Sequence, residues 1–383
     1  MAAGEVSGDM QGSFLAKALL SRDQTLHLFG VGGPKMKAAG VDLRIDATPF
    51  STVGVLEAVR FIVPLRRVLR HVQAIVRANR PDAAILIDNH GFNLLLARFL
   101  KKEEIPVISY FPPQAWIASS LFAGGVVRNT ELIISSLEKE AAIYRRHGGR
   151  AVSLGHPLLD IAKPGPNSET VLARLGIDRS RPLVALMPGS REQELERLAG
   201  PMFGAAAIIQ KRIPGMQFIL PVAAPHLKAR LQEIHREVRC SEEICYLDAD
   251  IYTCLSRCDL VITTTGTSTL EAALIGVPMV AAYRVNPLSA LLGRMFASTQ
   301  FVAMPNLLLG EFVVPEILQR EVTAERLAQA ALEILDDPKR QATMRKRFRE
   351  LPAMLGEEGV LERVAELVLN EVSSRCQPCP VGT

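Results

Sequence analysis

The sequence predicts an α/β protein with two doubly wound, parallel-sheet domains that face a cleft. Its 383 residues exceed what a single hydrophobic core usually supports. Continuous apolar runs alternate with amphipathic helical patterns along the chain, which is typical of parallel strands covered on both faces. A stretch bearing Pro, Gly and Ser, residues 161–182, separates two sets of these runs and is predicted to be a linker.

The apolar runs define the predicted strands. In the first half they are residues 26–31, 83–88, 106–111, 132–137 and 151–155, and in the second half 183–187, 217–222, 244–247, 259–264 and 278–283. Helical patterns at about 323–336 and 357–372 close the chain. The predicted domains are 1–160, then 183–350 after the linker, with a C-terminal helix and flexible tail over 351–383. Ligands are expected at the carboxyl ends of the strands.

The first residues have the shape of a strand-to-helix turn. The turn runs from Gly4 to Gly8, and Asp9 is a suitable helix cap. No predicted strand precedes this turn. We therefore expect the first strand of the domain to be missing, with the true start upstream of Met1.

Composition narrows the class of protein. A formal net charge of +4 is small for this length and does not indicate a nucleic-acid partner. No apolar stretch reaches the roughly 20 residues of a membrane span, and the start lacks the pattern of a signal peptide. A cytoplasmic protein is therefore expected.

The cysteines do not predict a metal site. Cys240, Cys245, Cys254 and Cys258 form no paired CxxC knuckles, and the tail pair Cys376 and Cys379 has no second pair. We interpret them as buried thiols and a loose tail.

Two loops in the second half are candidate anion sites. In the first, Pro188, Gly189, Ser190 and Arg191 join a strand to a helix whose first amides are expected to be free, and Arg191 adds a forked donor for phosphate. A plain turn with a solvated arginine fits the same residues.

The second loop is "TTTGTSTLEAAL", 263–274. After Gly266, the hydroxyl residues Thr267, Ser268 and Thr269 can cap a helix whose dipole favours a pyrophosphate. Glu271 could accept ribose hydroxyls, or be an exposed helix carboxylate. Neither loop is a Walker A or GxGxxG sequence, and the Gly-rich turn at 30–35 also lacks that fingerprint, so no nicotinamide cofactor is predicted.

The first half offers candidates for the chemistry. Asp88 ends a buried strand, where a carboxylate can act as a general base, although a turn or cap aspartate would look the same. His90 is an alternative base or a solvated loop residue. Trp116, the only tryptophan, lies in a Pro-rich loop and either packs in the core or lines an acceptor pocket.

Residues 60–80 form a basic helical pattern. Its arginines are Arg60, Arg66, Arg67, Arg70, Arg77 and Arg80, with no acid among them. Such a helix can lie on an anionic membrane surface, or pack on the core with a solvated face. Nucleic acid is disfavoured because aromatic residues do not interleave the arginines.

Six motifs together resemble one family. They are "AGEVSGD" (3–9), "GHPLLD" (155–160), "MPGSREQEL" (187–195), "TGTSTLEAAL" (265–274), "YRVNPLS" (283–289) and "MPNLLLGEFVVPEILQ" (304–319). In this order they resemble the lipid-A-disaccharide synthases. The resemblance implies a GT-B glycosyltransferase that needs no metal or cofactor. It would transfer 2,3-diacylglucosamine from UDP to the 6-hydroxyl of 2,3-diacylglucosamine 1-phosphate (lipid X), giving a β(1→6) disaccharide and UDP.

The resemblance also implies roles for individual residues. The UDP-sugar would be bound by Gly189, Ser190, Arg191, Gly266, Thr267, Ser268, Glu271 and Asn306. The catalytic base would be Asp88, with Phe92 and Asn93 of its motif retained. The acceptor side would include Glu5, Ser7, Asp9, Asn93 and Trp116.

The departures from the family pattern concern the acceptor side. His90 and Gly91 replace the Pro and second Asp of the family's "IDxPDFN" motif, and Ala118 stands where its "SPSxWAW" loop has a second Trp. A related UDP-sugar transferase or epimerase with another substrate, or a non-catalytic lipid-binding homologue, therefore stays open.

The implied reaction sets further expectations. An α-linked donor and a β-linked product imply a single inverting displacement. Acylated substrates favour the membrane interpretation of the basic helix, and so a peripheral position on the inner membrane. A homodimer is left open.

Overall fold

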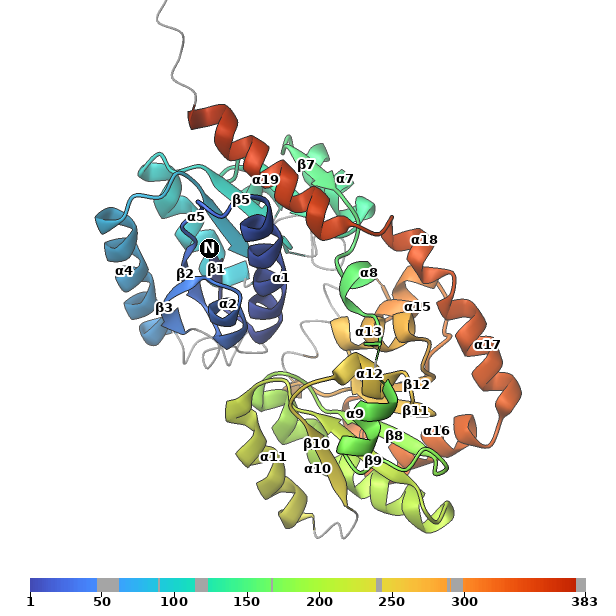
Figure 1. Ribbon diagram of the computed structural model, residues 1–383. Coiled ribbons are helices and arrows are strands. Elements are labelled where there is room, and N and C mark those ends of the chain that lie inside the picture. The colour runs from blue at the N-terminus through green and yellow to red at the C-terminus, as the bar shows by residue number, and fades with distance from the viewer. Residues whose placement is uncertain are drawn as a thin grey trace, which may run out of the picture. The chain divides into compact units, whose positions relative to one another are not determined.

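The structure, a computed structural model, describes residues 1–46, 62–88, 90–113, 123–166, 168–238, 243–287, 290 and 299–376. The chain divides into two compact units (Figure 1). Unit 1 combines Met1–Asp160 with the C-terminal segment from Leu355, and unit 2 comprises Ile161–Met295 and Thr299–Met354. An all-parallel sheet with helices lies in each unit, which confirms the predicted α/β class with two parallel sheets.

Unit 1 has the strand order β3-β2-β1-β4-β5-β6-β7. Its elements are β1 (Ala2–Ala3), α1 (Val6–Arg22), β2 (Phe29–Gly32), α2 (Pro34–Ala38), β3 (Asp42–Asp46), α4 (Ile62–Ala78), β4 (Ala84–Ile87), α5 (His90–Lys102), β5 (Val107–Tyr110), α6 (Ala123–Val127), β6 (Leu132–Ser135), α7 (Glu138–Arg146), β7 (Ala151–Ser153), α8 (Leu158–Ile161) and α19 (Val360–Cys376). The strand order reverses between β1 and β4, and ligands of doubly wound sheets bind at such a reversal.

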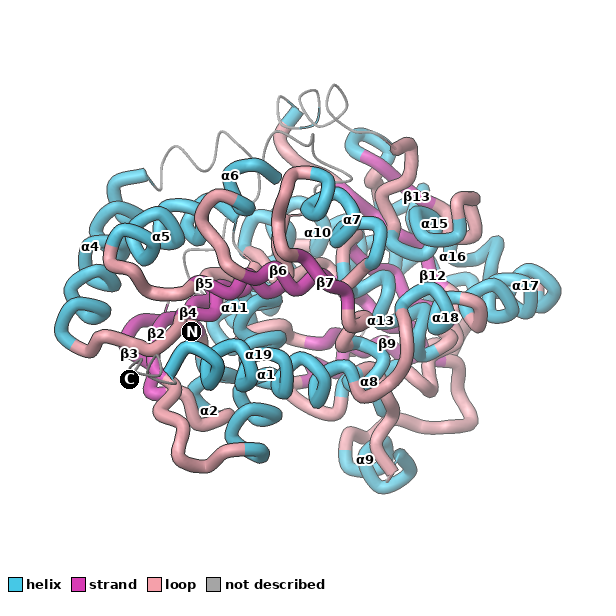
Figure 2. Tube along the Cα trace, turned by 90° about the horizontal axis from the view of Figure 1, so that it is seen from above, coloured by secondary structure: helices cyan, strands magenta, loops and turns pink. Residues whose placement is uncertain are grey.

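The central strands of unit 1 are fully buried, which explains why they could be predicted from continuous apolar runs in the sequence. Every residue of β4, β5 and β6 is buried, because helices cover the sheet on both faces. Figure 2 shows α4 to α7 along one face of this sheet and α1 and α19 along the other. The apolar side chains under α4 and α5 form one core cluster with β4 and β5.

The strand expected to be missing is present. Ala2 pairs with Val31 of β2 and with Leu86 of β4, so β1 lies at the centre of the sheet. The prediction that no strand precedes the first turn is therefore wrong. Two small residues are too short a segment for an apolar-run pattern to detect. The edge strand β3 was also missed, since its polar sequence "DLRID" alternates in burial as an edge strand does.

The C-terminal helix α19 belongs to unit 1. Both carboxylate oxygens of Asp160 accept backbone hydrogen bonds at its start, from Gly359 N (2.7 Å) and Leu361 N (2.9 Å). Near its end Arg150 forms a 2.6 Å ion pair with the buried Glu371. The "GHPLLD" motif, which contains Asp160, therefore anchors the end of the chain to its first domain.

Unit 2 has the strand order β10-β9-β8-β11-β12-β13. Its elements are α9 (Ser168–Arg174), β8 (Leu183–Met187), α10 (Glu192–Arg212), β9 (Gln217–Pro221), α11 (Pro225–Glu237), β10 (Ile244–Leu247), α12 (Ile251–Leu255), β11 (Leu260–Thr264), α13 (Thr267–Ile275), β12 (Met279–Tyr283), α15 (Met304–Leu309), β13 (Glu316–Leu318), η3 (Gln319–Glu321), α16 (Ala324–Leu335) and α17 (Pro338–Phe348), followed by α18 (Leu351–Leu355). Here the strand order reverses between β8 and β11, the strands that precede the two candidate anion loops.

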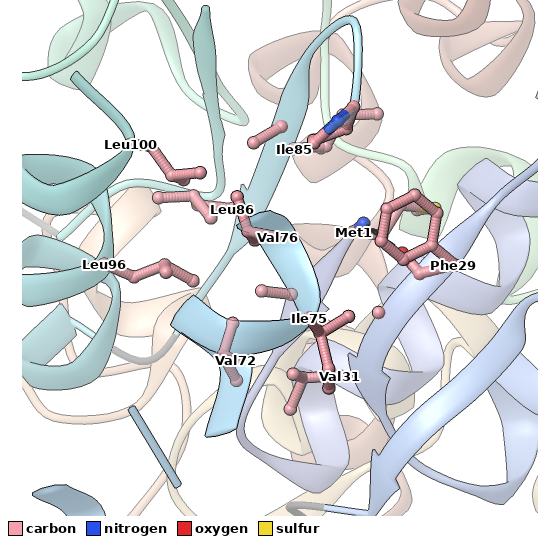
Figure 3. Close-up of a pocket in the computed structure, with 14 residues that line it drawn as sticks. Met1, Phe29, Val31, Val72, Ile75, Val76, Ile85, Leu86, Leu96 and Leu100 are labelled. Atoms are coloured by element: carbon pink, nitrogen blue, oxygen red, sulfur yellow. Dashed lines mark hydrogen bonds between the residues drawn. The ribbon is translucent and has the colours of Figure 1, made fainter. Parts of the chain in front are cut away.

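A small apolar cavity of about 40 Å³ lies in unit 1 between α4, α5 and the sheet (Figure 3). Phe29, Ala84 and Val72 are among its lining residues. Phe29 and Ala84 begin their strands, so the cavity is at the amino edge of the sheet, opposite the edge that carries Asp88. Among the helices that the structure describes, none has the length and apolar character needed to cross a membrane.

Candidate functional site

Two motifs far apart in the sequence meet at the strand-order reversal of unit 1. Ser7 Oγ donates a 2.8 Å hydrogen bond to Asp88 Oδ2, across 81 residues of sequence. Gly8 lies at this close approach, where a Cβ would be 3.3 Å from Ala3 Cβ, a tight contact, and 3.4 Å from Asp88 Cβ. The structure thus brings together the predicted base and one of the predicted acceptor-side residues.

The backbone holds Asp88 in an unusual conformation. Its φ of 53° is left-handed, a region that costs a non-glycine residue about 1–3 kcal/mol. Asn93 Nδ2 secures the turn by donating to the carbonyls of Ile87 (3.1 Å) and Asp88, while Asp88 N donates to Tyr110 O (3.2 Å). Strain held by surrounding bonds is characteristic of functional sites. The half-buried Asp88 carboxylate is thereby fixed at the carboxyl edge of the sheet.

The other acceptor-side residues have different positions. Asp9 is buried and accepts hydrogen bonds from Gly33 N (2.8 Å), Lys35 N (3.0 Å) and Met36 N (2.9 Å), so it caps α2. The interpretation that Asp9 caps its own helix is therefore wrong. That helix begins at Val6, after Glu5 in extended conformation as its N-cap.

The remaining predicted residues of the acceptor side are only partly described. Glu5 is half-buried and Asn93 is buried. Trp116 and Ala118 lie outside the described residues, and so does the side chain of His90. Gly91 lies exposed in the first turn of α5.

A buried polar cluster beside Asp88 was missed by sequence reasoning. Tyr110, Ser135 and Glu140 lie at the ends of β5 and β6 and at the start of α7, each at most 2% exposed. Tyr110 OH and Glu140 Oε1 have no hydrogen-bond partner within the described structure. The signal was the helical spacing of Glu140 and Tyr144, which lie on one buried face of α7.

The surroundings of Glu140 favour its neutral form. Burial raises the pKa of its carboxyl to about 8; the Ser135 hydroxyl offsets part of this rise, and the negative charge of Asp88 adds to it. His156 of the "GHPLLD" motif is likewise neutral, since burial lowers its pKa to about 4. Its ring meets Phe111 edge-on, and its Nδ1 accepts from Leu158 N (3.2 Å).

In unit 2 the two candidate anion loops follow neighbouring strands. β8 and β11 pair in parallel, with Met187 opposite Thr263. Gly189 and Gly266 therefore emerge at the same edge, at the strand-order reversal of this sheet. The topology thus brings two loops that lie far apart in the sequence to one edge of the sheet.

The amides of the first loop are already occupied. Glu194 Oε2 accepts from Ser190 N (3.0 Å) and Arg191 N (3.3 Å), while Arg191 Nη1 donates to Glu194 Oε1 (2.9 Å). The expectation of free amides therefore fails for Ser190 and Arg191, because a glutamate at the third helical position reaches back to them. Gly189 is required here: its φ is 129°, and a Cβ would lie 2.3 Å from Glu194 Oε2.

The second loop is braced by its own hydroxyls. Gly266, with φ 109°, is the N-cap of α13 and is exposed. Ser268 Oγ donates to Thr264 O (3.0 Å) and Thr269 Oγ1 to Gly266 O (2.7 Å), so these hydroxyls do not cap the helix. The half-buried Thr267 opens the first turn, where helix geometry leaves N–H groups without intrahelical acceptors. Backbone amides and the helix dipole are therefore what this loop offers an anion.

Glu271 lies one turn along α13. It is buried, and the Tyr252 hydroxyl forms a hydrogen bond with it. Burial raises the pKa of Tyr252, and the charge of Glu271 raises it further. The carboxylate of Glu271 is thus held in place by α12.

Asn306 has its full hydrogen-bonding capacity used within the protein. Its side chain is fully buried; Nδ2 donates to Val314 O and Glu316 Oε1, and Oδ1 accepts from Val313 N and Val314 N, all at 2.8–2.9 Å. The neighbouring Met304 N donates to Thr269 Oγ1 (3.1 Å). Asn306 therefore braces the segment that supports the second anion loop, and a direct contact with a nucleotide stays a prediction.

The cysteines are consistent with buried thiols. Cys254 and Cys258 are buried free thiols, and Cys245 is half-buried. Within the described ranges no group of three or more His, Cys, Asp or Glu side chains is placed to hold a metal ion.

Comparisons of the sequence with a family model and with known proteins identify the same family. The sequence model of the family described as lipid-A-disaccharide synthetase matches residues 1–367. The chain is 35% identical over 381 residues to the lipid-A-disaccharide synthase of Geobacter metallireducens, covering 97% of each chain. It is 36% identical over 377 residues to that of Synechocystis sp., covering 96% of this chain and 95% of the relative.

Solved structures share the fold at low identity. The UDP co-structure of MnaA from S. aureus matches with a TM-score of 0.67 at 12% identity, over 98% of this chain and 97% of that one. The UDP-GlcNAc 2-epimerase from Neisseria meningitidis bound to UDP-GlcNAc matches with a TM-score of 0.63 at 10% identity, over 95% and 97%. These likenesses show the two-domain GT-B fold that glycosyltransferases and epimerases share.

Proposed function

The chain belongs to the lipid-A-disaccharide synthetase family, and from that premise we propose that it joins UDP-2,3-diacylglucosamine to lipid X. The products are the β(1→6) lipid A disaccharide 1-phosphate and UDP. The observation that carries the proposal is the Ser7–Asp88 pair at the strand-order reversal of unit 1. A carboxylate that two family motifs hold in this way is positioned to act on an acceptor hydroxyl.

The proposed reaction is a single inverting displacement. Asp88 takes the proton of the acceptor 6-hydroxyl as the oxygen forms its bond to the anomeric carbon. The bond from that carbon to the phosphate oxygen breaks, and the electron pair leaves with UDP. Ser7 donates to Asp88 Oδ2 and so holds the carboxylate in place for this step.

The departing UDP gains negative charge, which unit 2 is proposed to stabilise. Arg191 brings a guanidinium that Glu194 holds in place, and α13 brings the positive end of its dipole. Both lie on loops from adjacent strands at the ligand-binding edge of the sheet. In this proposal Glu271 receives ribose hydroxyls, and Asn306 supports the loop.

Replacing Arg191 by Ala is expected to weaken UDP binding about 10- to 100-fold, because a charge-assisted hydrogen bond contributes roughly 1.5–3 kcal/mol. Isothermal titration calorimetry with UDP measures the change. Arg212→Ala is the matched control, since Arg212 is exposed at the far end of the same helix. A Kd for UDP that is the same in Arg191→Ala and wild type would remove this loop from the nucleotide site.

We propose that α4 attaches the protein to an anionic membrane surface. Its inner side packs on the core through Val72 and Val76, which are buried. Its outer side carries the exposed Arg66, Arg67 and Arg70. Since the core uses its apolar side, the proposed attraction is electrostatic rather than an apolar insertion. Acylated substrates, one of them a phosphate, would be met at that surface.

The triple variant Arg66→Gln, Arg67→Gln, Arg70→Gln is expected to bind anionic vesicles about 100-fold more weakly. Each basic residue near such a surface contributes about 1 kcal/mol, or about fivefold. Vesicle flotation at low salt measures this. Arg77→Gln is the control on the same helix and should change little, because Glu103 already balances its charge at 2.9 Å. Equal flotation of wild type and triple variant would contradict the proposal.

The proposed activity is tested by incubation with UDP-2,3-diacylglucosamine and lipid X, followed by mass spectrometry of the lipid. The expected product is the disaccharide 1-phosphate, with an equal amount of UDP. UDP release only with a different acceptor would indicate a related transferase or epimerase. No UDP release with any acceptor would indicate a non-catalytic homologue.

A further inference from the structure

A buried acid lies beside the proposed catalytic base, on the neighbouring part of the sheet. β4, β5 and β6 are adjacent, and in their register Ile87 lies opposite Tyr110, which lies opposite Ile134. Asp88 and Ser135 therefore follow at the same level of the carboxyl edge. Glu140 lies in the first turn of the next helix, α7, only 2% exposed.

The surroundings of the two carboxyls differ. Asp88 is half-buried and receives the Ser7 hydroxyl. Glu140 is buried, its Oε1 has no hydrogen-bond partner in the described structure, and the groups acting on its charge are the Ser135 hydroxyl and the Asp88 carboxylate. Burial and a like charge both favour the protonated form. Of two neighbouring carboxyls, the more deeply buried one is favoured to keep its proton, here Glu140.

Within the described part of the chain, Tyr144 and an ion pair of α7 do not balance the charge of Glu140. Tyr144, one turn along α7, donates its hydroxyl to Pro113 O (2.6 Å). Burial raises the pKa of Tyr144, and the charge of Glu140 raises it further. Glu138 and Arg145 of the same helix pair with each other near the surface. An ionised Glu140 would thus be a buried charge next to a second carboxylate.

Resting on the proposed function, we propose that Glu140 is a positioning residue for Asp88. Glu140 retains a proton, so that the negative charge of the cluster lies on Asp88. Loss of the Glu140 proton at high pH sets the alkaline limit of sugar transfer. When Glu140 ionises, its charge repels Asp88 and disturbs a turn that already holds a left-handed residue. It also repels an acceptor that carries a phosphate.

The pH profile of kcat tests this role in wild type and in Glu140→Gln, which keeps the shape and neutrality of a protonated glutamate. Wild-type kcat is expected to fall about tenfold per pH unit above a midpoint near 8, the pKa of Glu140. Glu140→Gln should keep kcat at pH 7 within about threefold and remain flat through this range. Glu138→Gln, an exposed change two residues away, should follow wild type.

Two outcomes would overturn the proposal. One is an alkaline limb in Glu140→Gln with the same midpoint as wild type. The other is a loss of kcat at pH 7 in Glu140→Gln as large as in Glu140→Met, which would mark a merely structural residue.

A measurement that needs no substrate tests the proposed coupling of Glu140 and Asp88 independently of the proposed function. In protein labelled with ¹³C at side-chain carboxyls, one glutamate should titrate near pH 8, and its signal should be absent in Glu140→Gln. The Asp88 carboxyl signal should shift with the same midpoint in wild type and not in Glu140→Gln. If transfer fails in wild type while both signals behave this way, the function is wrong and the coupling stands. Without these signals the coupling itself is refuted.

Discussion

Asp88→Asn is expected to lower kcat for disaccharide formation by about 10² to 10⁴, the usual contribution of a general base. The UDP affinity should stay unchanged, because the nucleotide loops belong to unit 2. The variant removes little else. Asparagine tolerates the left-handed φ of 53° at this position, and its amide oxygen can still accept from Ser7.

The measurement is UDP release in steady state together with calorimetric UDP binding. Asp82→Asn is the matched control, since Asp82 is exposed just before the same strand and should leave both quantities unchanged. A kcat for Asp88→Asn within tenfold of wild type would remove Asp88 from the mechanism. A parallel loss of UDP affinity would indicate that the change disturbs the fold rather than the base.

The sequence was most informative where single segments determine their own structure. The buried strands β4, β5, β6, β8 and β11 are continuous apolar runs, and each was predicted. The loops after β4, β8 and β11 were predicted as sites, because ligands of such sheets bind at the carboxyl ends of the strands. Short or polar strands were missed: β1 is two alanines, and β13, "EIL", is a three-residue strand within a motif. Their strand character comes from pairing with neighbours, which no local pattern records.

The residues of the candidate site were easier to predict from the sequence than the hydrogen bonds between them. Ser7 and Asp88 were both candidates, but only the placing of β1 beside β4 shows that they bond. The loop amides near Arg191 were expected to be free, yet Glu194, three residues on, occupies them. Glu140 was not noticed, because a glutamate near a helix start is usually solvated. Burial, which decides its protonation, is a property of the packed fold.

Asn306 shows how a motif residue can serve a site without touching the ligand. Its amide bridges Val313, Val314 and Glu316, and the Glu316 carboxylate also accepts from Val302 N and Ala303 N. The buried Asn306 side chain, together with Glu316, thus connects the beginning and the end of the segment 302–316. The resemblance implies that Asn306 is a nucleotide ligand, whereas its hydrogen bonds make it an internal brace. These two roles predict different experimental results.

Asn306→Ala is expected to lower the free energy of unfolding of unit 2 by roughly 3–5 kcal/mol. Each lost hydrogen bond contributes about 0.5–1.5 kcal/mol, and buried backbone groups are left without partners. Thermal or urea unfolding measures the loss. Asn79→Ala is the control, because Asn79 is exposed and its side chain donates to Ile75 O at the surface of its helix. Its change should stay within about 0.5 kcal/mol.

UDP titration of the same Asn306→Ala protein separates the two roles. If Asn306 is a brace, UDP affinity and stability should fall together, since Met304 joins this segment to Thr269 of the α13 loop. Asn306→Asp sharpens the comparison: it keeps the acceptor oxygen for Val313 N and Val314 N but sets a second carboxylate against Glu316. It too should destabilise unit 2. A loss of UDP affinity at unchanged stability in both variants would instead make Asn306 a direct ligand of the nucleotide.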